Sequence, residues 1–222
     1  MRQLLSKIKL SWPHSRPFRF LDKLISKRFQ RNLRNDSFTI LSSNCIGGVI
    51  YHRLGKQFLS PTINMWFRQP DFVSFCLHLD YYLQQKLSFY RGEESYPTAE
   101  LRGTDEIPTI RLYFNHAKTE EEAEAAWEKR KPRIVRENLF IVLYKLDGIT
   151  VEQLKQLETV PCRGKVLLSA VPVPEIPWTV VIQPNRKAPN PYSFLDRNLF
   201  GIRRYEKYFD FVHWLNTGSV SA

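Results

Sequence analysis

The sequence lacks the features of a membrane-spanning or disulfide-stabilised protein. None of its apolar runs approaches the roughly 20 residues needed to span a bilayer. Four basic residues between Lys7 and Arg19 interrupt the apolar residues near the N-terminus, so we expect no secretory signal. The three cysteines, at positions 45, 76 and 162, form no paired motif, which argues against a disulfide framework and a zinc site. We therefore expect a cytoplasmic protein with reduced thiols.

Acidic residues are also scarce at one end of the chain. The net charge is +11, from 33 Lys and Arg against 22 Asp and Glu. Residues 1–35 hold 10 Lys or Arg and one acid, Asp22, which gives +9. The other residues hold 23 basic and 21 acidic side chains, which gives +2. The high isoelectric point therefore belongs to the N-terminal segment.

That segment is predicted to be a basic amphipathic tail. Leu21, Leu24 and Phe29 share one helical face, with Lys and Arg around them. This pattern suits an anionic membrane surface, so we expect a peripheral protein at the inner membrane face. Alternatively the tail folds back on the body or remains mobile. Nucleic acid is not an expected partner, because the nearly neutral body carries no reader motif.

The rest of the chain alternates between strand-like and helix-like segments. The expected strands are 38–41, 109–114, 138–144, 165–170 and 178–182. The expected helices are 46–54, 71–87, 119–131, 150–157 and 205–215, and residues 91–108 read as loop. We predict one α/β domain over residues 36–217 and a flexible C-terminus at 218–222. Its predicted architecture is three-layer α/β/α around a central mixed sheet of five to six strands, with one antiparallel pair over 165–182.

The segment Ser42–Gly48 carries the strongest chemical signal. It places Cys45 between a strand and a helix, at the edge of the sheet where α/β proteins build their sites. The helix N-terminus favours a thiolate, and the amides of Ile46, Gly47 and Gly48 could stabilise an oxyanion. The sequence does not fit the Gly-x-Ser-x-Gly elbow of α/β-hydrolases. The alternative is that Cys45 is a small buried hydrophobe and the glycines only permit tight packing.

A nucleophilic cysteine needs a base, and His116 is the better of two candidates. His116 follows a predicted strand, and two strand ends on one sheet edge can meet. His52 lies seven residues after Cys45, which is about 10 Å along a helix, so direct contact is not expected. Asp147 follows another strand and could orient the imidazole, although Asp-Gly is also an ordinary turn.

Further polar residues are candidates for substrate binding. The segment after the Cys45 helix can line the same cleft, or it can simply form a rigid turn. Arg130 could bind a carboxylate or phosphate, or its stem could pack on Trp127. The full candidate set for substrate binding is Asn44, Gly47, Gly48, His52, Ser60, Thr62, Asn64 and Arg130. No metal site is expected, and the sequence names no cofactor.

These segments resemble a bacterial family known as domain-of-unknown-function family 1919. The resemblance runs over roughly residues 36–217. It is carried by 38–48, 51–55, 58–64, 116–118, Glu121, Ala123, Trp127, Arg130, Arg133, 138–140, 208–210 and 214–216. Family members commonly sit among genes for capsule and exopolysaccharide synthesis, which implies a role in surface glycans. Relatives tend to have an acidic residue where this chain has Arg53.

Three functions follow as hypotheses. The first is an acyltransferase that acts through Cys45 on a glycan precursor, with His116 as base and a glycan and an activated sugar or acyl group as substrates. The second is a non-catalytic module that binds a glycan or a lipid-linked intermediate. The third is a glycosyltransferase. The lack of a clear Asp-x-Asp metal motif argues against it and leaves only the metal-independent kind.

Overall fold

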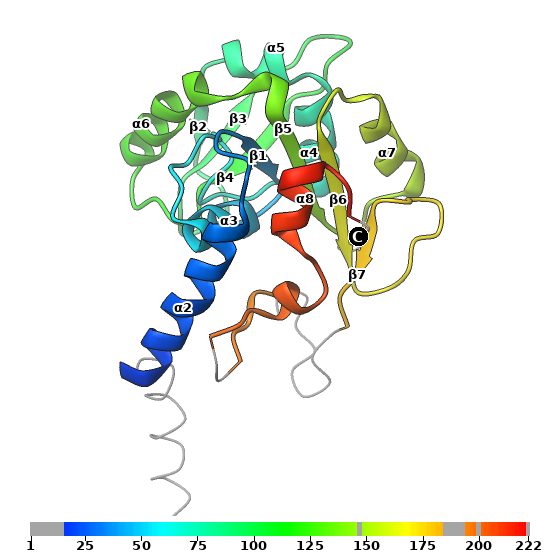
Figure 1. Cartoon of the computed structure of the whole chain (residues 1–222). Coiled ribbons are helices and arrows are strands. Elements are labelled where there is room, and N and C mark those ends of the chain that lie inside the picture. Colours follow the sequence, from blue (N-terminus) through cyan, green and yellow to red (C-terminus); the bar gives the residue numbers. More distant parts are fainter. Residues whose placement is uncertain (1–15, 146–147, 184–193, 199–200, 221–222) are drawn as a thin grey trace, which may run out of the picture.

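The computed structural model describes residues 16–145, 148–183, 194–198 and 201–220 (Figure 1). Its strands are β1 (Thr39–Ser42), β2 (Ser88–Tyr90), β3 (Thr98–Leu101), β4 (Ile110–Tyr113), β5 (Leu139–Tyr144), β6 (Gly164–Ser169) and β7 (Thr179–Val181). Its α-helices are α2 (Arg16–Asn32), α3 (Ile46–Leu54), α4 (Gln69–Leu77), α5 (Leu79–Gln84), α6 (Glu120–Arg130), α7 (Val151–Gln156) and α8 (Phe211–Thr217). Short 3-10 helices occur at Lys131–Arg133, Arg136–Asn138, Leu157–Thr159 and Arg204–Lys207.

A four-stranded parallel sheet forms the centre of the fold, in the order β1-β5-β6-β7. Its strand β5 is the apolar run that the sequence predicts as a strand buried on both faces, and every residue of it is buried. Successive side chains along its strands point to opposite faces of the sheet, and each face packs into its own hydrophobic cluster. Leu41 and Ile141 pack with α4, α6 and α7, whereas Ile40 and Phe140 pack with α3 and α8.

The predicted antiparallel pair over 165–182 is wrong, because β6 and β7 run parallel with Leu167 opposite Thr179. A parallel pair requires the chain to run back along the sheet before the second strand begins. Strand β7 has only three residues, or about 10 Å of chain, so the connection from β6 to β7 has a short distance to cover and needs no helix. That segment buries Val173 and Ile176 against the core. Burial of these two side chains stabilises the return path.

A separate antiparallel sheet contains β2, β3 and β4, in that order. Strand β3 lies inside the 91–108 segment that the sequence analysis reads as loop. Its four residues are flanked by Gly, Pro and acidic residues. A strand this short shows too little alternation of apolar and polar side chains to be recognised among them. The α/β class is therefore confirmed, but the strands divide into sheets of four and three instead of forming one mixed sheet.

Helix ends follow the local signals in most places. Helix α3 ends at Gly55 with a φ of 63°, and Thr150 forms a complete capping box for α7. Two predicted helices are shorter than expected. Helix α4 begins before Asp71 and breaks at His78, and the last helix begins only after Asp210, which caps it.

The described part of the predicted tail is attached to the body. The ring of Phe29 in α2 lies 4.7 Å from that of Phe211, and Asp22 forms an ion pair with Arg53. Asn216 accepts a hydrogen bond from the Arg34 amide at 2.8 Å. The described residues of this segment therefore pack on the body, as the folding-back alternative expects. At the other end, Val220 is partly buried within the predicted flexible C-terminus.

Candidate functional site

A cleft of about 690 Å³ lies between α2, α3 and the turn that follows β4. Its lining includes five of the residues that the sequence analysis selects, which are Cys45, Gly48, His52, Asn64 and His116. Cys45 stands at the N-terminal end of α3, directly after the β1 turn. The strand-to-helix placement predicted for Cys45 is confirmed.

Cys45 and His116 are in contact across this cleft. The distance from Cys45 Sγ to His116 Nε2 is 3.3 Å, within hydrogen-bonding range for sulfur. The thiol is half-buried and the imidazole is exposed to the cleft. A thiol within reach of an imidazole nitrogen is the arrangement that nucleophilic catalysis by cysteine requires.

The two residues meet by a different route from the one predicted. They follow strands of different sheets, β1 and β4, and not neighbouring ends on one edge. The segment Met65–Phe67 joins the two places. Its Phe67 amide donates to the Ser43 carbonyl at 3.0 Å, while Trp66 exchanges two backbone hydrogen bonds with Tyr113, the last residue of β4. This segment positions His116 relative to the thiol.

The environment of the thiol favours its neutral form. Burial raises the pKa of Cys45 above the usual range, and a hydrogen bond with the Asn115 side chain opposes that rise. Desolvation thus opposes the thiolate that the sequence analysis expects at this helix N-terminus. A neutral thiol reacts as a nucleophile only when a base removes its proton, and His116 Nε2 lies within reach of Cys45 Sγ.

The helix N-terminus offers fewer free amides than predicted. The Ile46 amide donates to Asn44 Oδ1 at 3.0 Å, and the Gly47 amide donates to Ser42 Oγ at 3.1 Å. Among the residues that the structure describes, the amide of Gly48 has no hydrogen-bond partner. Two of the three expected oxyanion donors are thus used to cap the helix, and Gly48 remains available.

Both glycines are close to neighbouring groups. A Cβ added to Gly47 would lie 2.8 Å from Ser42 Cβ, so Gly47 permits the tight β1–α3 turn. A Cβ on Gly48 would lie 3.2 Å from Ile63 Cγ2 and 3.6 Å from Asn64 Oδ1. Gly48 therefore keeps the cleft wall open beside Asn64, a residue in left-handed conformation with a φ of 62°.

Ser60 and Thr62 do not face the cleft. Both side chains are fully buried, and their hydroxyl oxygens lie 3.1 Å apart. Thr62 Oγ1 also accepts from the Ser42 amide at 3.0 Å. Their hydroxyls hold the loop against β1, which is the rigid-turn alternative. Of this loop, Asn64 and Phe58 reach the cleft.

The remaining candidates have separate positions. His52 is exposed and lines the cleft, without a hydrogen bond to Cys45 in the described part of the chain. The Arg130 guanidinium donates to the Ile63 carbonyl at 2.9 Å and lies over the ring of Phe58, so it supports the cleft wall. Asp147 lies outside the described residues.

The sequence analysis misses several residues of the site. Asn115, which is outside the cleft lining, lowers the pKa of the Cys45 thiol by a side-chain hydrogen bond, and its position beside His116 in the same turn is the signal that could have found it. Basic residues from three segments line the cleft, namely Lys23, Lys27, Arg53, Arg197 and Arg203. No local pattern joins these five, because their proximity depends on how α2 packs.

Two general features of the structure bear on the site. Within the described ranges, no group of three or more His, Cys, Asp or Glu side chains is arranged to hold a metal ion. Over the same ranges, no helix is both long and apolar enough to cross a lipid bilayer.

Comparison with known proteins places the chain in a family. A family model described as "Domain of unknown function (DUF1919)" matches residues 18–216. This chain belongs to that family. A relative in Haemophilus influenzae, whose name is "Uncharacterized protein", is 30% identical over 192 residues, which cover 86% of this chain and 90% of the relative. The DUF1919 match begins at residue 18 and so includes most of α2, whereas the resemblance seen in the motifs begins at residue 36.

Proposed function

We propose that this protein transfers an acyl group through Cys45, with His116 as the general base. The observation that carries the proposal is the 3.3 Å distance between Cys45 Sγ and His116 Nε2 within an open cleft. The free amide of Gly48, three residues after the thiol, supports it, because acyl transfer develops negative charge on a carbonyl oxygen.

The first half-reaction acylates the thiol. His116 Nε2 accepts the Sγ proton as sulfur bonds to the carbonyl carbon of an acyl ester or thioester. The carbonyl π electrons move to oxygen, and the Gly48 amide donates to that oxygen. When the adduct collapses, the leaving group takes the proton from His116, and a thioester on Cys45 remains.

The second half-reaction passes the acyl group to a hydroxyl. His116 Nε2 removes the hydroxyl proton, the oxygen attacks the thioester carbon, and Sγ departs and regains the proton. We take the acceptor to be a glycan precursor used in surface polysaccharide synthesis. This assignment rests on the role in surface glycans that the resemblance to the family implies.

The proposal can be tested with a generic acyl donor. Wild type incubated with p-nitrophenyl acetate should gain one acetyl group on the Cys45 peptide, detected by mass spectrometry. Cys45→Ala should lose this labelling, and His116→Ala should slow it by about 100-fold or more. Cys162→Ala, which removes another half-buried thiol, is the matched control and should behave as wild type. Undiminished labelling in Cys45→Ala would exclude the mechanism.

A second candidate function is a module that binds a glycan or lipid-linked intermediate without reaction. The raised pKa of the Cys45 thiol favours it, because a neutral thiol is a poor nucleophile. Calorimetric titration separates the two functions. Stoichiometric binding of an oligosaccharide by wild type and Cys45→Ala alike, with no acyl transfer in either, would support the binding module.

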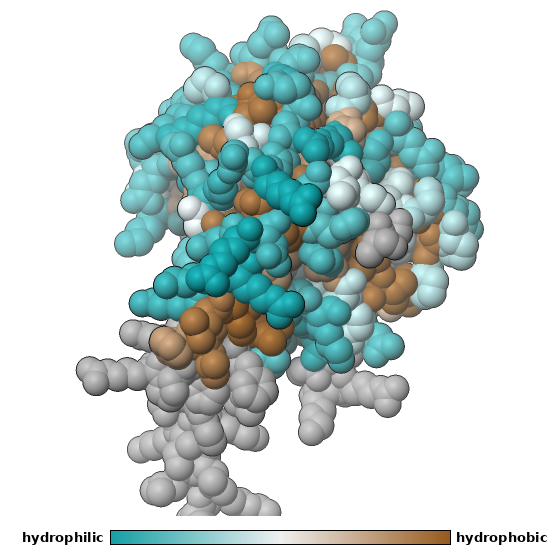
Figure 2. Space-filling view, viewed as in Figure 1, coloured by the Kyte–Doolittle hydropathy of each residue, from teal (hydrophilic) through white to brown (hydrophobic). Residues whose placement is uncertain are grey.

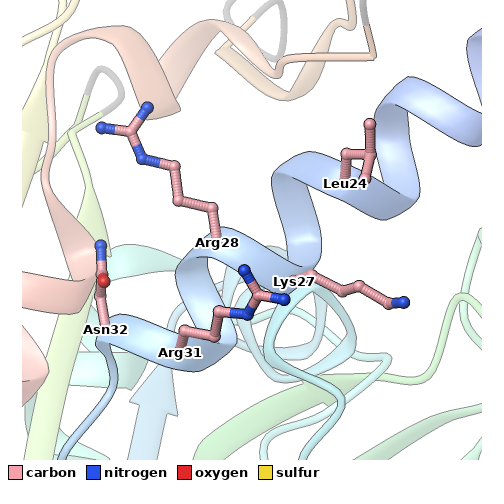
Figure 3. Close-up of a pocket in the computed structure, with 5 residues that line it drawn as sticks. All are labelled: Leu24, Lys27, Arg28, Arg31 and Asn32. Atoms are coloured by element: carbon pink, nitrogen blue, oxygen red, sulfur yellow. The ribbon is translucent and has the colours of Figure 1, made fainter.

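We also propose that α2 holds the protein at an anionic membrane surface. Its outer face exposes Phe20, Leu21 and Leu24 by 62%, 36% and 46%, and Figure 2 shows an apolar patch on α2 bordered by hydrophilic side chains. Arg28 and Arg31 extend from the same helix beside Leu24 (Figure 3). Apolar insertion together with about 1 kcal/mol for each basic residue is the usual basis of such binding.

Point substitutions test this better than removal of the whole segment, because part of α2 packs against the body. Phe20→Ser with Leu24→Ser should reduce sedimentation with phosphatidylserine-containing vesicles by about tenfold, since two apolar anchors are lost. Val171→Ser, another exposed apolar side chain far along the sequence, is the matched control. Equal loss in the control, or no loss in either variant, would contradict the proposal.

A further inference from the structure

The wall of the cleft formed by α2 and the segment before α8 carries an excess of positive charge. Its lining includes five Lys or Arg side chains and one carboxylate, that of Asp22. The five come from α2, α3 and residues 197–203, and they are Lys23, Lys27, Arg53, Arg197 and Arg203. Three separate segments thus place cations around one space.

Only part of this charge is neutralised within the protein. Arg53 forms ion pairs with Asp22 and, at 2.7 Å, with the buried Glu206. Asp22 also lies 3.5 Å from Arg197. Lys23, Lys27 and Arg203 have no ion pair with any described carboxylate. The cleft therefore keeps positive charge that a ligand can neutralise.

Arg203 lies in surroundings that disfavour its positive charge. Burial lowers its pKa from the ordinary value, and the nearby Arg197 lowers it further. Among the residues that the structure describes, its guanidinium makes one hydrogen bond, from Nη1 to the Leu195 carbonyl at 2.8 Å. A guanidinium has five N–H donors, so most of them remain for an anionic ligand.

We propose that this cationic wall binds a phosphate or diphosphate group of the substrate that enters the Cys45 cleft. The inference rests on the proposed function only in placing the substrate in that cleft. Cations on three segments suit a group with several charged oxygens better than a single carboxylate, and arginine forks match phosphate geometry. Arg197 shares Asp22 with Arg53, and Arg53 follows Cys45 by eight residues, or about 12 Å along α3. The cationic wall therefore lies at a distance from the thiol, and a ligand that reaches both is elongated.

Helix geometry provides a matched pair of variants for the test. Lys23 and Lys27 line the cleft, whereas Arg28 and Arg31 do not. Lys27 lies about 40° from Arg31 around α2 and also borders the hollow that Arg28 and Arg31 line, so Lys23 is the member of its pair that lines the cleft alone. Figure 3 shows Lys27 and Arg28 leaving the helix in different directions. Lys23→Ala with Lys27→Ala, and Arg28→Ala with Arg31→Ala, each remove two charges from one helix.

The experiment is a calorimetric titration with inorganic pyrophosphate at low ionic strength. Wild type should bind it, the Lys23/Lys27 double variant should bind at least tenfold more weakly, and the Arg28/Arg31 double variant should change less than twofold. Equal weakening in both double variants would mean that binding depends only on the net charge of the protein, which would overturn the proposal. The proposal would also be overturned if wild type did not bind pyrophosphate. Cys45→Ala should bind pyrophosphate as wild type does, so failure of the acyl-transfer mechanism leaves this result intact.

A second set of measurements tells which substrate carries the phosphate. Acylation of Cys45 by acetyl-coenzyme A, whose phosphates lie at the far end of a long arm, is compared with acylation by phosphate-free p-nitrophenyl acetate. If the Lys23/Lys27 variant slows only the first, the group belongs to the acyl donor. If it slows neither acylation but weakens pyrophosphate binding, the group belongs to the acceptor. If it slows both acylations equally, the substitutions disturb the thiol and the proposal fails.

Discussion

The two ends of α3 use polar groups in opposite ways. At its C-terminal end, Arg53 is only 5% exposed and is bonded by Glu206, Asp22, Ser26 and the Gly201 carbonyl. At its N-terminal end, Cys45 is half-buried and touches His116 beside a free amide. One end is saturated with internal bonds, and the other keeps bonding capacity for a ligand.

This difference distinguishes polar groups that hold the structure together from polar groups that can interact with a ligand. A buried charge with complete partners fixes how elements pack, and the Arg53 network joins α2, α3 and the segment before α8. Groups with unused donors or acceptors are where a substrate can bind and react. The saturated end therefore shapes the cleft, while the unsaturated end acts within it. Four substitutions or measurements test this division.

The largest expected effect is at the saturated end. Arg53→Met should lower the free energy of unfolding by about 3–5 kcal/mol, because Glu206 would keep a buried, unpaired charge. Urea unfolding measures it. Arg111→Met, which removes an exposed ion pair with Glu100 on the antiparallel sheet, is the control and should leave the free energy of unfolding nearly unchanged, because solvent screens this pair. Similar small losses in both would remove the distinction between the two ends of α3.

The turn that leads into the reactive end should be next in sensitivity. Gly47→Ala brings a Cβ to 2.8 Å from Ser42 Cβ, so we expect a loss of about 1–3 kcal/mol. Gly48→Ala should cost less, since the flexible Ile63 side chain can move away from a contact at 3.2 Å. Thermal or urea unfolding of both variants compares them, and the reverse order would show that the turn does not depend on Gly47.

The thiol itself should contribute little to stability. Cys45→Ala should change the free energy of unfolding by within about 0.5 kcal/mol, because the side chain is half-buried and its partners face the cleft. Cys76→Ala, at a fully buried position, should cost about 1 kcal/mol. A larger loss at Cys45 than at Cys76 would assign Cys45 to the core.

The smallest effect concerns pH. Burial raises the pKa of Cys45, so its alkylation by iodoacetamide should rise at a higher pH than that of a free cysteine. Asn115→Ala should shift the rise to still higher pH, because the Asn115 hydrogen bond lowers this pKa. Peptide-resolved mass spectrometry follows Cys45 and, as internal control, Cys162, which should not respond to Asn115→Ala. A shift toward lower pH would contradict the assigned roles.

Much of the local structure was predictable from the sequence. The apolar run of β5, the Thr150 cap and the Gly55 stop each act over a few residues, so a short window of sequence contains the full signal. The parallel β6–β7 pair and strand β3 were not predictable. Their pairing depends on partners elsewhere in the chain, and both are too short to show a clear period.

The candidate site divides in the same way. The sequence alone determined that Cys45 stands between a strand and a helix, because strand, turn and helix signals adjoin there. Only the tertiary structure decided that a histidine 71 residues away lies against the thiol, that two of three helix amides are already bonded, and that α2 places cations around the cleft. Such contacts arise from the packing of two sheets and a docked helix. They join residues that are far apart in the sequence, so no short stretch of sequence can predict them.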